Sequence, residues 1–127
     1  MSTYKVGDGH DIALESLTDV SPQPSSLGIQ STRRTYAASG AVYDEGSFVE
    51  LNFGVIDTAV NYQLLLDQFG IEGELTNEVT VYVRSKIFTW VRMNGTAVQP
   101  EIGRDVRWDR FFPRNVTILI KDLVAAS

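Results

Sequence analysis

The sequence predicts a mainly β protein: an antiparallel β-sandwich or barrel with one α-helix at about residues 58–69 and an extended N-terminal arm. Three observations predict this class. Apolar and polar residues alternate in most segments after residue 28, helical spacing of apolar residues occurs once, and strands and helices do not alternate as they do around a parallel sheet. With 127 residues the chain has the length of one domain, which can bury about two-thirds of its unfolded surface.

Composition excludes several classes of protein. Hydrophobic residues make up 43% of the chain and charged residues 21%, which is typical of globular domains and excludes wholesale disorder. The absence of cysteine excludes a disulfide scaffold, thiol catalysis and Cys-based zinc sites. The net charge of −5 has the wrong sign for coating nucleic acid. No apolar run approaches the roughly 20 residues that span a bilayer, and none has signal-peptide length, so we expect the chain to mature in a cytoplasm.

Residues 1–28 show little periodicity and end in the breaker-rich run SPQPSS at 21–26. Weak alternation around Ile12 and Leu14 allows one short strand. Because the segment offers few side chains to a core, it predicts either a floppy terminus or an arm that becomes ordered against a neighbouring subunit. The expected organisation is therefore an N-terminal arm at 1–28 and a single β-rich domain at 29–127.

Strand patterns follow, with turn signals between them. We expect strands near residues 29–37, 48–55, 79–84, 87–93 and 116–121. The first has no strongly apolar face, which is typical of an edge or intersubunit strand, and the last is apolar on both faces, which predicts a central strand. Gly40 and residues 43–46 predict a loop. The pair Asn94-Gly95 predicts a tight hairpin turn, because both residues tolerate positive φ.

The helix at 58–69 is indicated by a single apolar stripe. Asp57 or Thr58 is suited to cap its N-terminus, and Gly70 stands where a left-handed C-terminal cap is required. We expect the stripe to pack against a sheet. Its members are Ala59, Tyr62, Leu65, Leu66 and Phe69.

Converging titratable side chains, which most enzymes need, are scarce. His10 is the only histidine, no nucleophile-elbow motif accompanies it, and no phosphate loop or dinucleotide fingerprint is present. We therefore expect no enzymatic activity, no catalytic residues, no cofactor and no metal. A hydrolase hypothesis would rest only on His10 and the carboxylates of Glu72, Glu74 and Glu78.

The most unusual segment is residues 104–114 (RDVRWDRFFPR), which combines four arginines with three aromatic residues. Residues 1–57 carry three basic and eight acidic groups, whereas residues 100–127 carry five basic and four acidic groups. Arginine and tryptophan are enriched in interface hot spots, so we expect a subunit interface here. In the competing interpretation, Asp105 and Asp109 neutralise the neighbouring arginines and the aromatic side chains enter the core. These aspartates also argue against a platform for single-stranded nucleic acid. The predicted interface residues are Arg104, Arg107, Trp108, Arg110 and Phe111, facing Asp44 and Glu45, or the acidic N-terminal arm, of the next subunit.

Three runs of residues resemble small structural proteins encoded by tailed bacteriophages and prophages: 35–40 (TYAASG), 62–70 (YQLLLDQFG) and 112–117 (FPRNVT). The similarity extends from about Arg33 to Leu123. The resemblance implies a virion component without an active site, which assembles with copies of itself and with other virion proteins into a symmetric array.

Within that class, the order of strands, one helix and further strands is similar to tail-tube and tail-terminator proteins. The resemblance therefore implies a tail-associated protein: a tube, a terminator or a neighbouring ring component. Capsid decoration (cement) proteins are the alternative, and a monomeric binding module is a further one. A typical tube protein is longer and carries a long stacking insertion, which is not evident in this sequence. The implied location is the virion, after synthesis in the host bacterial cytoplasm, as a homo-oligomer with no membrane and no specific nucleic acid as partner.

Overall fold

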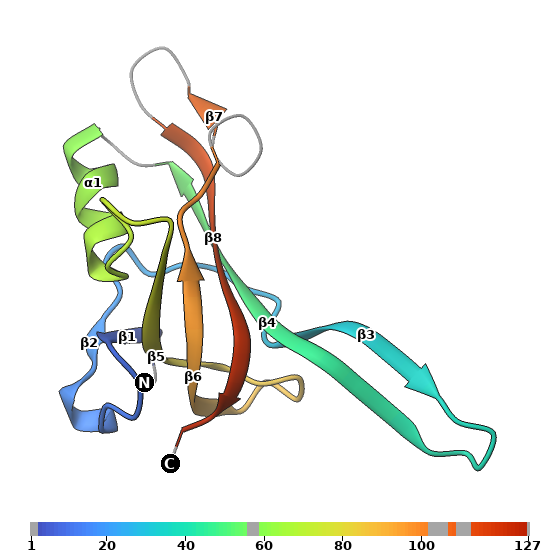
Figure 1. The fold of residues 1–127 in the computed structure, drawn as a ribbon. Helices are drawn as coiled ribbons and strands as arrows, with labels where there is room; N and C mark the ends of the chain where they lie inside the picture. Colours follow the sequence, from blue (N-terminus) through green and yellow to red (C-terminus); the bar gives the residue numbers. More distant parts are fainter. Residues whose placement is uncertain (1–2, 56–58, 102–106, 109–112, 127) are drawn as a thin grey trace.

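A computed structural model describes residues 3–55, 59–101, 107–108 and 113–126, and shows a mainly β protein with one α-helix (Figure 1). This confirms the predicted class. The elements are β1 (Lys5–Asp8), the short 3₁₀ helix η1 (Leu14–Ser16), β2 (Thr18–Asp19), β3 (Gln30–Tyr36), β4 (Val42–Val55), α1 (Ala59–Gln68), β5 (Thr76–Arg84), β6 (Trp90–Val98), β7 (Arg107–Trp108) and β8 (Pro113–Ala125).

All strands belong to one antiparallel sheet in the order β2-β1-β5-β6-β8-β4-β3, with β7 paired to β8 outside this path. The sheet is open, which corrects the expected sandwich or barrel. It curls, and residues 25–29 connect its two sides: Ser25 pairs with Asn52 of β4, and the Ile29 amide donates to the Arg84 carbonyl at the end of β5. The apolar alternation identifies buried faces, but it does not determine which strands pair.

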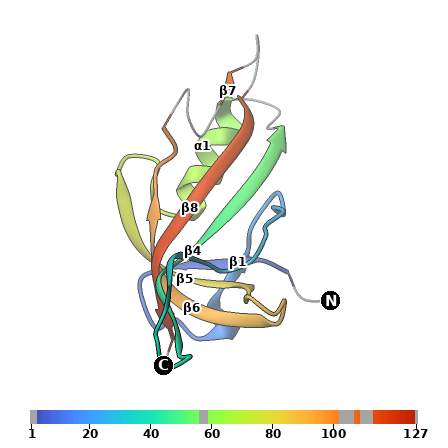
Figure 2. The same ribbon diagram turned by 90° about the vertical axis from the view of Figure 1, so that its right-hand side faces the viewer.

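The core lies between the curled sheet and α1, which passes behind β8 in the view of Figure 2. β8 is a central strand, as expected, and its apolar residues 116, 118 and 120 are fully buried. The core also includes Tyr4, Val6, Val20, Ile29, Val49, Leu51, Phe53, Tyr62, Leu65, Leu66, Phe69, Ile71, Val79, Val81, Val83, Ala97 and Leu123.

Helix α1 occupies residues 59–68, and four residues of its predicted stripe are buried: Tyr62, Leu65, Leu66 and Phe69. Its end has the hydrogen bonds of a Schellman motif, from the Ile71 amide to the Leu66 carbonyl and from the Gly70 amide to the Asp67 carbonyl. Gly70 has φ +70°, as its predicted capping role requires. The predicted N-terminal caps, Asp57 and Thr58, lie outside the described residues.

Residues 3–28 are packed into the domain, so the expected extended arm is wrong for this part of the chain. β1 pairs with β5, and Tyr4, Val6 and Val20 are each at most 7% exposed. The Gln23 side chain accepts from the Tyr4 amide and donates to the Tyr4 carbonyl. The buried residues come from short strands and loops, and a search for periodicity cannot detect such an arrangement. A 3₁₀ turn at residues 14–16 replaces the short strand expected there.

The predicted hairpin turn at Asn94-Gly95 is also wrong, because β6 runs through both residues. A side chain at Gly95 would meet Leu123 Cδ2 at 2.7 Å and Ile120 Cγ2 at 2.8 Å. Glycine is therefore needed here for the close approach of β8. A register irregularity between β6 and β8 lies at the same place.

Asn94 is 5% exposed and belongs to a polar network that holds the N-terminal segment against β6. Its Oδ1 accepts from the Asp11 amide (2.9 Å) and from the Thr80 hydroxyl (2.8 Å), and its Nδ2 donates to Asp11 Oδ1 (2.7 Å). The left-handed φ of Asp11 (+61°) allows the chain to make this contact.

Replacing Asn94 with alanine should lower the free energy of unfolding by about 1–3 kcal/mol, because the Asp11 amide and the Thr80 hydroxyl lose a buried partner. Urea denaturation measures this change. Gln63→Ala on the exposed face of α1 is the control, and its effect should stay within about 0.5 kcal/mol. Equal stability of the two variants would show that the network does not stabilise the fold.

Candidate functional site

The most distinctive feature of the fold is a β-hairpin that projects from the body (Figure 1). The 14-residue β4 has two successive partners: residues 42–48 pair with β3, and residues 49–55 pair with β8. We call β3, the turn at 37–41 and residues 42–48 of β4 the projecting hairpin. Gly40 lies in the turn, as predicted, whereas residues 43–46, also expected to form a loop, are part of β4.

None of the described side chains of the projecting hairpin is buried. Near its tip, Tyr36 and Val42 are cross-strand neighbours and are 72% and 52% exposed. β3 forms an edge of the sheet, as predicted. Isolated two-stranded hairpins are marginally stable, and exposed strand edges readily pair with other chains. An exposed projection of this kind is therefore suited to contacts with another molecule.

The base of the projecting hairpin is anchored to the body. Ile29 and Val49 lie in the core at its two ends, and Lys86 Nζ donates to the Ser31 hydroxyl. Within the hairpin, the Thr32 hydroxyl donates to the Gly46 carbonyl at 2.7 Å. Gly46 has φ +68°, and a side chain at this position would lie 2.7 Å from Thr32 Oγ1. The base thus has a defined conformation, which fixes the direction of the hairpin.

Two predicted interface residues, Asp44 and Glu45, lie on the projecting hairpin. Only their backbone is described, and its register places Asp44 opposite Arg34 and Glu45 opposite Arg33. Opposite charges in directly opposed positions stabilise a strand pair. Each acidic residue therefore has a basic cross-strand neighbour in its own molecule, in addition to any contact with another subunit.

The described part of the arginine–aromatic segment, namely β7 and the first residues of β8, lies at the opposite end of the molecule from the hairpin tip (Figure 1). The backbone of Arg107 and Trp108 forms β7, with Arg107 opposite Arg114 and Trp108 opposite Pro113 of β8. The structure thus places two of the five predicted residues on a short paired strand. The other three, Arg104, Arg110 and Phe111, lie outside the described residues.

The length of β4 separates the two predicted partner surfaces. Its Val55 pairs with Arg114 of β8, which pairs in turn with Arg107, whereas Glu45 lies ten residues earlier in β4. At roughly 3.3 Å per strand residue, the two regions are about 30 Å apart. Arg107 therefore cannot meet Glu45 of its own molecule, so a contact between these two residues requires a second copy.

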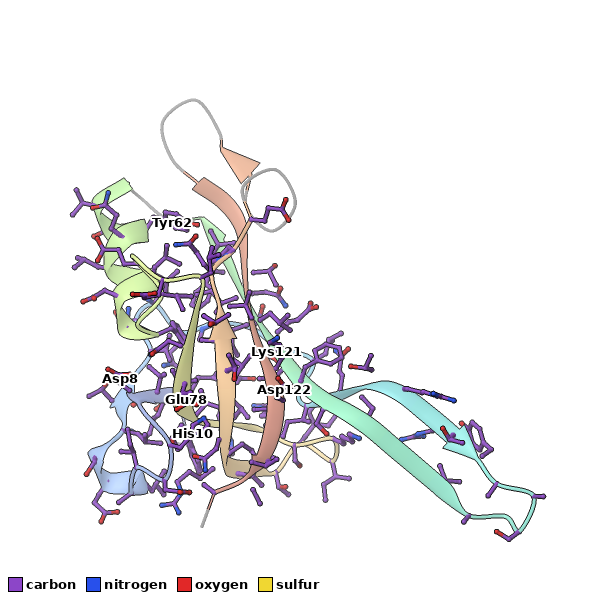
Figure 3. All side chains as sticks on the ribbon, viewed as in Figure 1. Asp8, His10, Tyr62, Glu78, Lys121 and Asp122 are labelled. Atoms are coloured by element: carbon purple, nitrogen blue, oxygen red, sulfur yellow. The ribbon has the colours of Figure 1, made fainter. Side chains whose placement is uncertain are left out.

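The titratable residues that sequence analysis considered for catalysis lie elsewhere, with His10 and Glu78 close to β1 and β5 (Figure 3). His10 Nε2 lies 3.0 Å from the Gly95 carbonyl, which helps to hold the N-terminal segment against β6. Over the described part of the chain, no group of three His, Asp or Glu side chains is arranged to hold a metal. None of the described helices is long and apolar enough to cross a membrane.

One exposed ion pair connects β1 and β2. Hydrogen bonds from Lys5 and from Thr3, each 2.7 Å long, lower the pKa of the Asp19 carboxyl. The resulting stabilisation is present above the ordinary pKa of an aspartate and is lost as the pH falls through the lowered value. Because the Asp19 side chain is largely exposed, the pair contributes little to the fold.

Sequence analysis missed the exposed pair Tyr36 and Val42. The available signal was an aromatic and a β-branched residue flanking a glycine-containing turn in a segment without an apolar face. In comparisons with known proteins, no protein family, no curated protein and no solved structure matches the chain.

Proposed function

We propose that this protein is a structural subunit of a self-assembling, symmetric array, namely a tail-associated component of a bacteriophage virion. The observation that carries the proposal is the projecting hairpin. It extends a sheet edge and an exposed Tyr36 away from the core, without burying any of its described side chains in its own molecule. The choice of a phage tail rests on the sequence resemblance alone.

The separation of the two surfaces supports assembly from head to tail. A contact between different surfaces on successive copies is heterologous, and repetition of such a contact generates rings or filaments. In the proposed contact, Trp108 or Phe111 enters a pocket of the neighbour, while Arg107 and Arg110 determine register and encounter rate near its Asp44 and Glu45.

Replacing Arg107 and Arg110 together with alanine should weaken assembly without lowering the melting temperature of the isolated subunit. The loss should be larger at low salt, since ionic screening already weakens the wild-type contact at high salt. Sedimentation velocity at two salt concentrations, with thermal unfolding, measures both effects. Lys121→Ala, at an exposed basic residue of β8, is the control. A lowered melting temperature in the double variant would mean that these arginines stabilise the fold instead.

A capsid decoration protein remains the alternative within the same class. Imaging distinguishes the two, because labelled protein should bind to tails in one case and to the capsid surface in the other. A chain that binds one unrelated partner and never itself would be a monomeric binding module.

A further inference from the structure

The turn between β5 and β6 exposes two large apolar side chains. Ile87 is 79% exposed and Phe88 is 60% exposed. Phe88 has φ +62°, a left-handed conformation that is unfavourable for a bulky residue. Such strain persists only where the surroundings enforce it, and it is found preferentially at functional positions.

The hydrogen bonds of this turn enforce that conformation. The Ser85 amide donates to the Thr89 carbonyl (2.6 Å), and the Phe88 amide donates to the Ser85 carbonyl (3.0 Å). The Ser85 hydroxyl oxygen also accepts from the amides of Ile87 and Thr89. The turn is therefore a preorganised apolar knob, and we use this name for Ile87 and Phe88.

An apolar groove of about 650 Å³ lies where α1 meets the first residues of β5 and the last residues of β6. Leu75, at its rim, is 75% exposed, whereas Tyr62 and Leu66 in its wall are nearly buried. Its lining also includes Val98, Pro100 and Glu101. We call it the helix groove.

The knob and the helix groove lie at opposite ends of the β5–β6 ladder. Thr76 is paired with Val98 beside the groove, and Arg84 is paired with Trp90 beside the knob. The ladder is nine residue pairs long, about 30 Å at the usual rise of a strand, so the knob cannot reach the groove of its own molecule.

The charges around the knob and around the helix groove are of opposite sign. Arg84 and Lys86 flank the knob, and the turn itself contains no carboxylate. Around the helix groove, Glu101 is exposed, and Gln99 Nε2 donates to the carbonyl of Glu72, which places that exposed acidic residue beside the groove. A basic rim around the knob would thus meet an acidic rim around the groove, which favours correct orientation.

From these observations we infer that the knob of one copy docks into the helix groove of a second copy of this chain. The contact is heterologous and is distinct from the one formed by the projecting hairpin, although it rests on the proposed assembly function. Ile87 and Phe88 supply the buried anchors, and Lys86 and Glu101 lie at the rim.

Cysteine cross-linking tests this contact directly, because the chain has no cysteine of its own. Ile87→Cys and Leu75→Cys change residues that are more than 70% exposed, so both variants should fold. A short bis-maleimide linker added to an equimolar mixture should give covalent dimers, and the double variant should give a ladder of multimers. The control mixture pairs Ile87→Cys with Val124→Cys, a thiol at an exposed apolar position on β8.

Dimers well above the control yield support the contact, and Phe88→Ser introduced into the Ile87→Cys variant should reduce them at least several-fold. Yields equal to those of the control, both with Leu75→Cys and with Thr76→Cys as the groove thiol, would overturn the inference. Sedimentation of the wild-type protein separates the two proposals. If the wild-type protein forms multimers but the cross-linking yields equal those of the control, only the knob contact is refuted. A strict monomer refutes the assembly function itself.

Discussion

Leu65→Ala should lower the free energy of unfolding by about 2–5 kcal/mol, the range observed for truncating a buried leucine. Leu65 is fully buried in the stripe of α1 that packs against the sheet. The substitution removes apolar surface from the core and leaves a cavity that the neighbouring strands cannot fully close. Chemical denaturation followed by far-ultraviolet circular dichroism measures the loss.

The adjacent residue provides the matched control. Leu64 has the same chemistry and lies on the same helix, but it is 57% exposed. Leu64→Ala should therefore change stability by no more than about 0.5 kcal/mol. Equal effects of the two substitutions would contradict the placement of α1 against the sheet.

Shortening the projecting hairpin should abolish assembly and leave the fold intact. Deleting Arg33 and Arg34 together with Asp44 and Glu45 removes two opposed pairs, so the register, the turn and the net charge are all preserved. Removing an even number of residues from each strand also keeps every remaining side chain on its original face. The hairpin becomes shorter by about 7 Å, which should prevent its tip from reaching a neighbour.

Tyr36 tests the tip separately. Tyr36→Ser should weaken assembly by at least tenfold if the exposed ring is an anchor, whereas Tyr36→Phe should retain most of it. Thermal unfolding should be unchanged in both variants, because Tyr36 is 72% exposed. Normal assembly by the shortened hairpin would show that the hairpin is not an assembly element.

Features determined by local periodicity were predictable from the sequence. α1 and the central strand β8 lie where the pattern of apolar residues predicts them, and β3 is at an edge, as its lack of an apolar face predicts. Asn94-Gly95 was wrongly predicted to form a turn, because the close approach of Leu123 and Ile120, which are distant in sequence, to Gly95 outweighs a local turn preference.

The candidate site was predictable only in part. Asp44 and Glu45, predicted as interface residues from their charge, lie on the projecting hairpin, but their place in a long β-strand depends on pairing between β4 and β3. The N-terminal segment was misjudged because hydrogen bonds such as those of Gln23 and Asn94 hold it, and these leave no periodic signal.

We propose that this chain forms a repeated assembly through its projecting hairpin. Sedimentation velocity over a wide range of protein and salt concentrations, with electron microscopy of the heaviest species, tests it most directly. We predict a discrete multimer of the 14.1 kDa chain with visible rotational or helical symmetry, which is absent when the hairpin is shortened. A single 14.1 kDa species under every condition would contradict the claim.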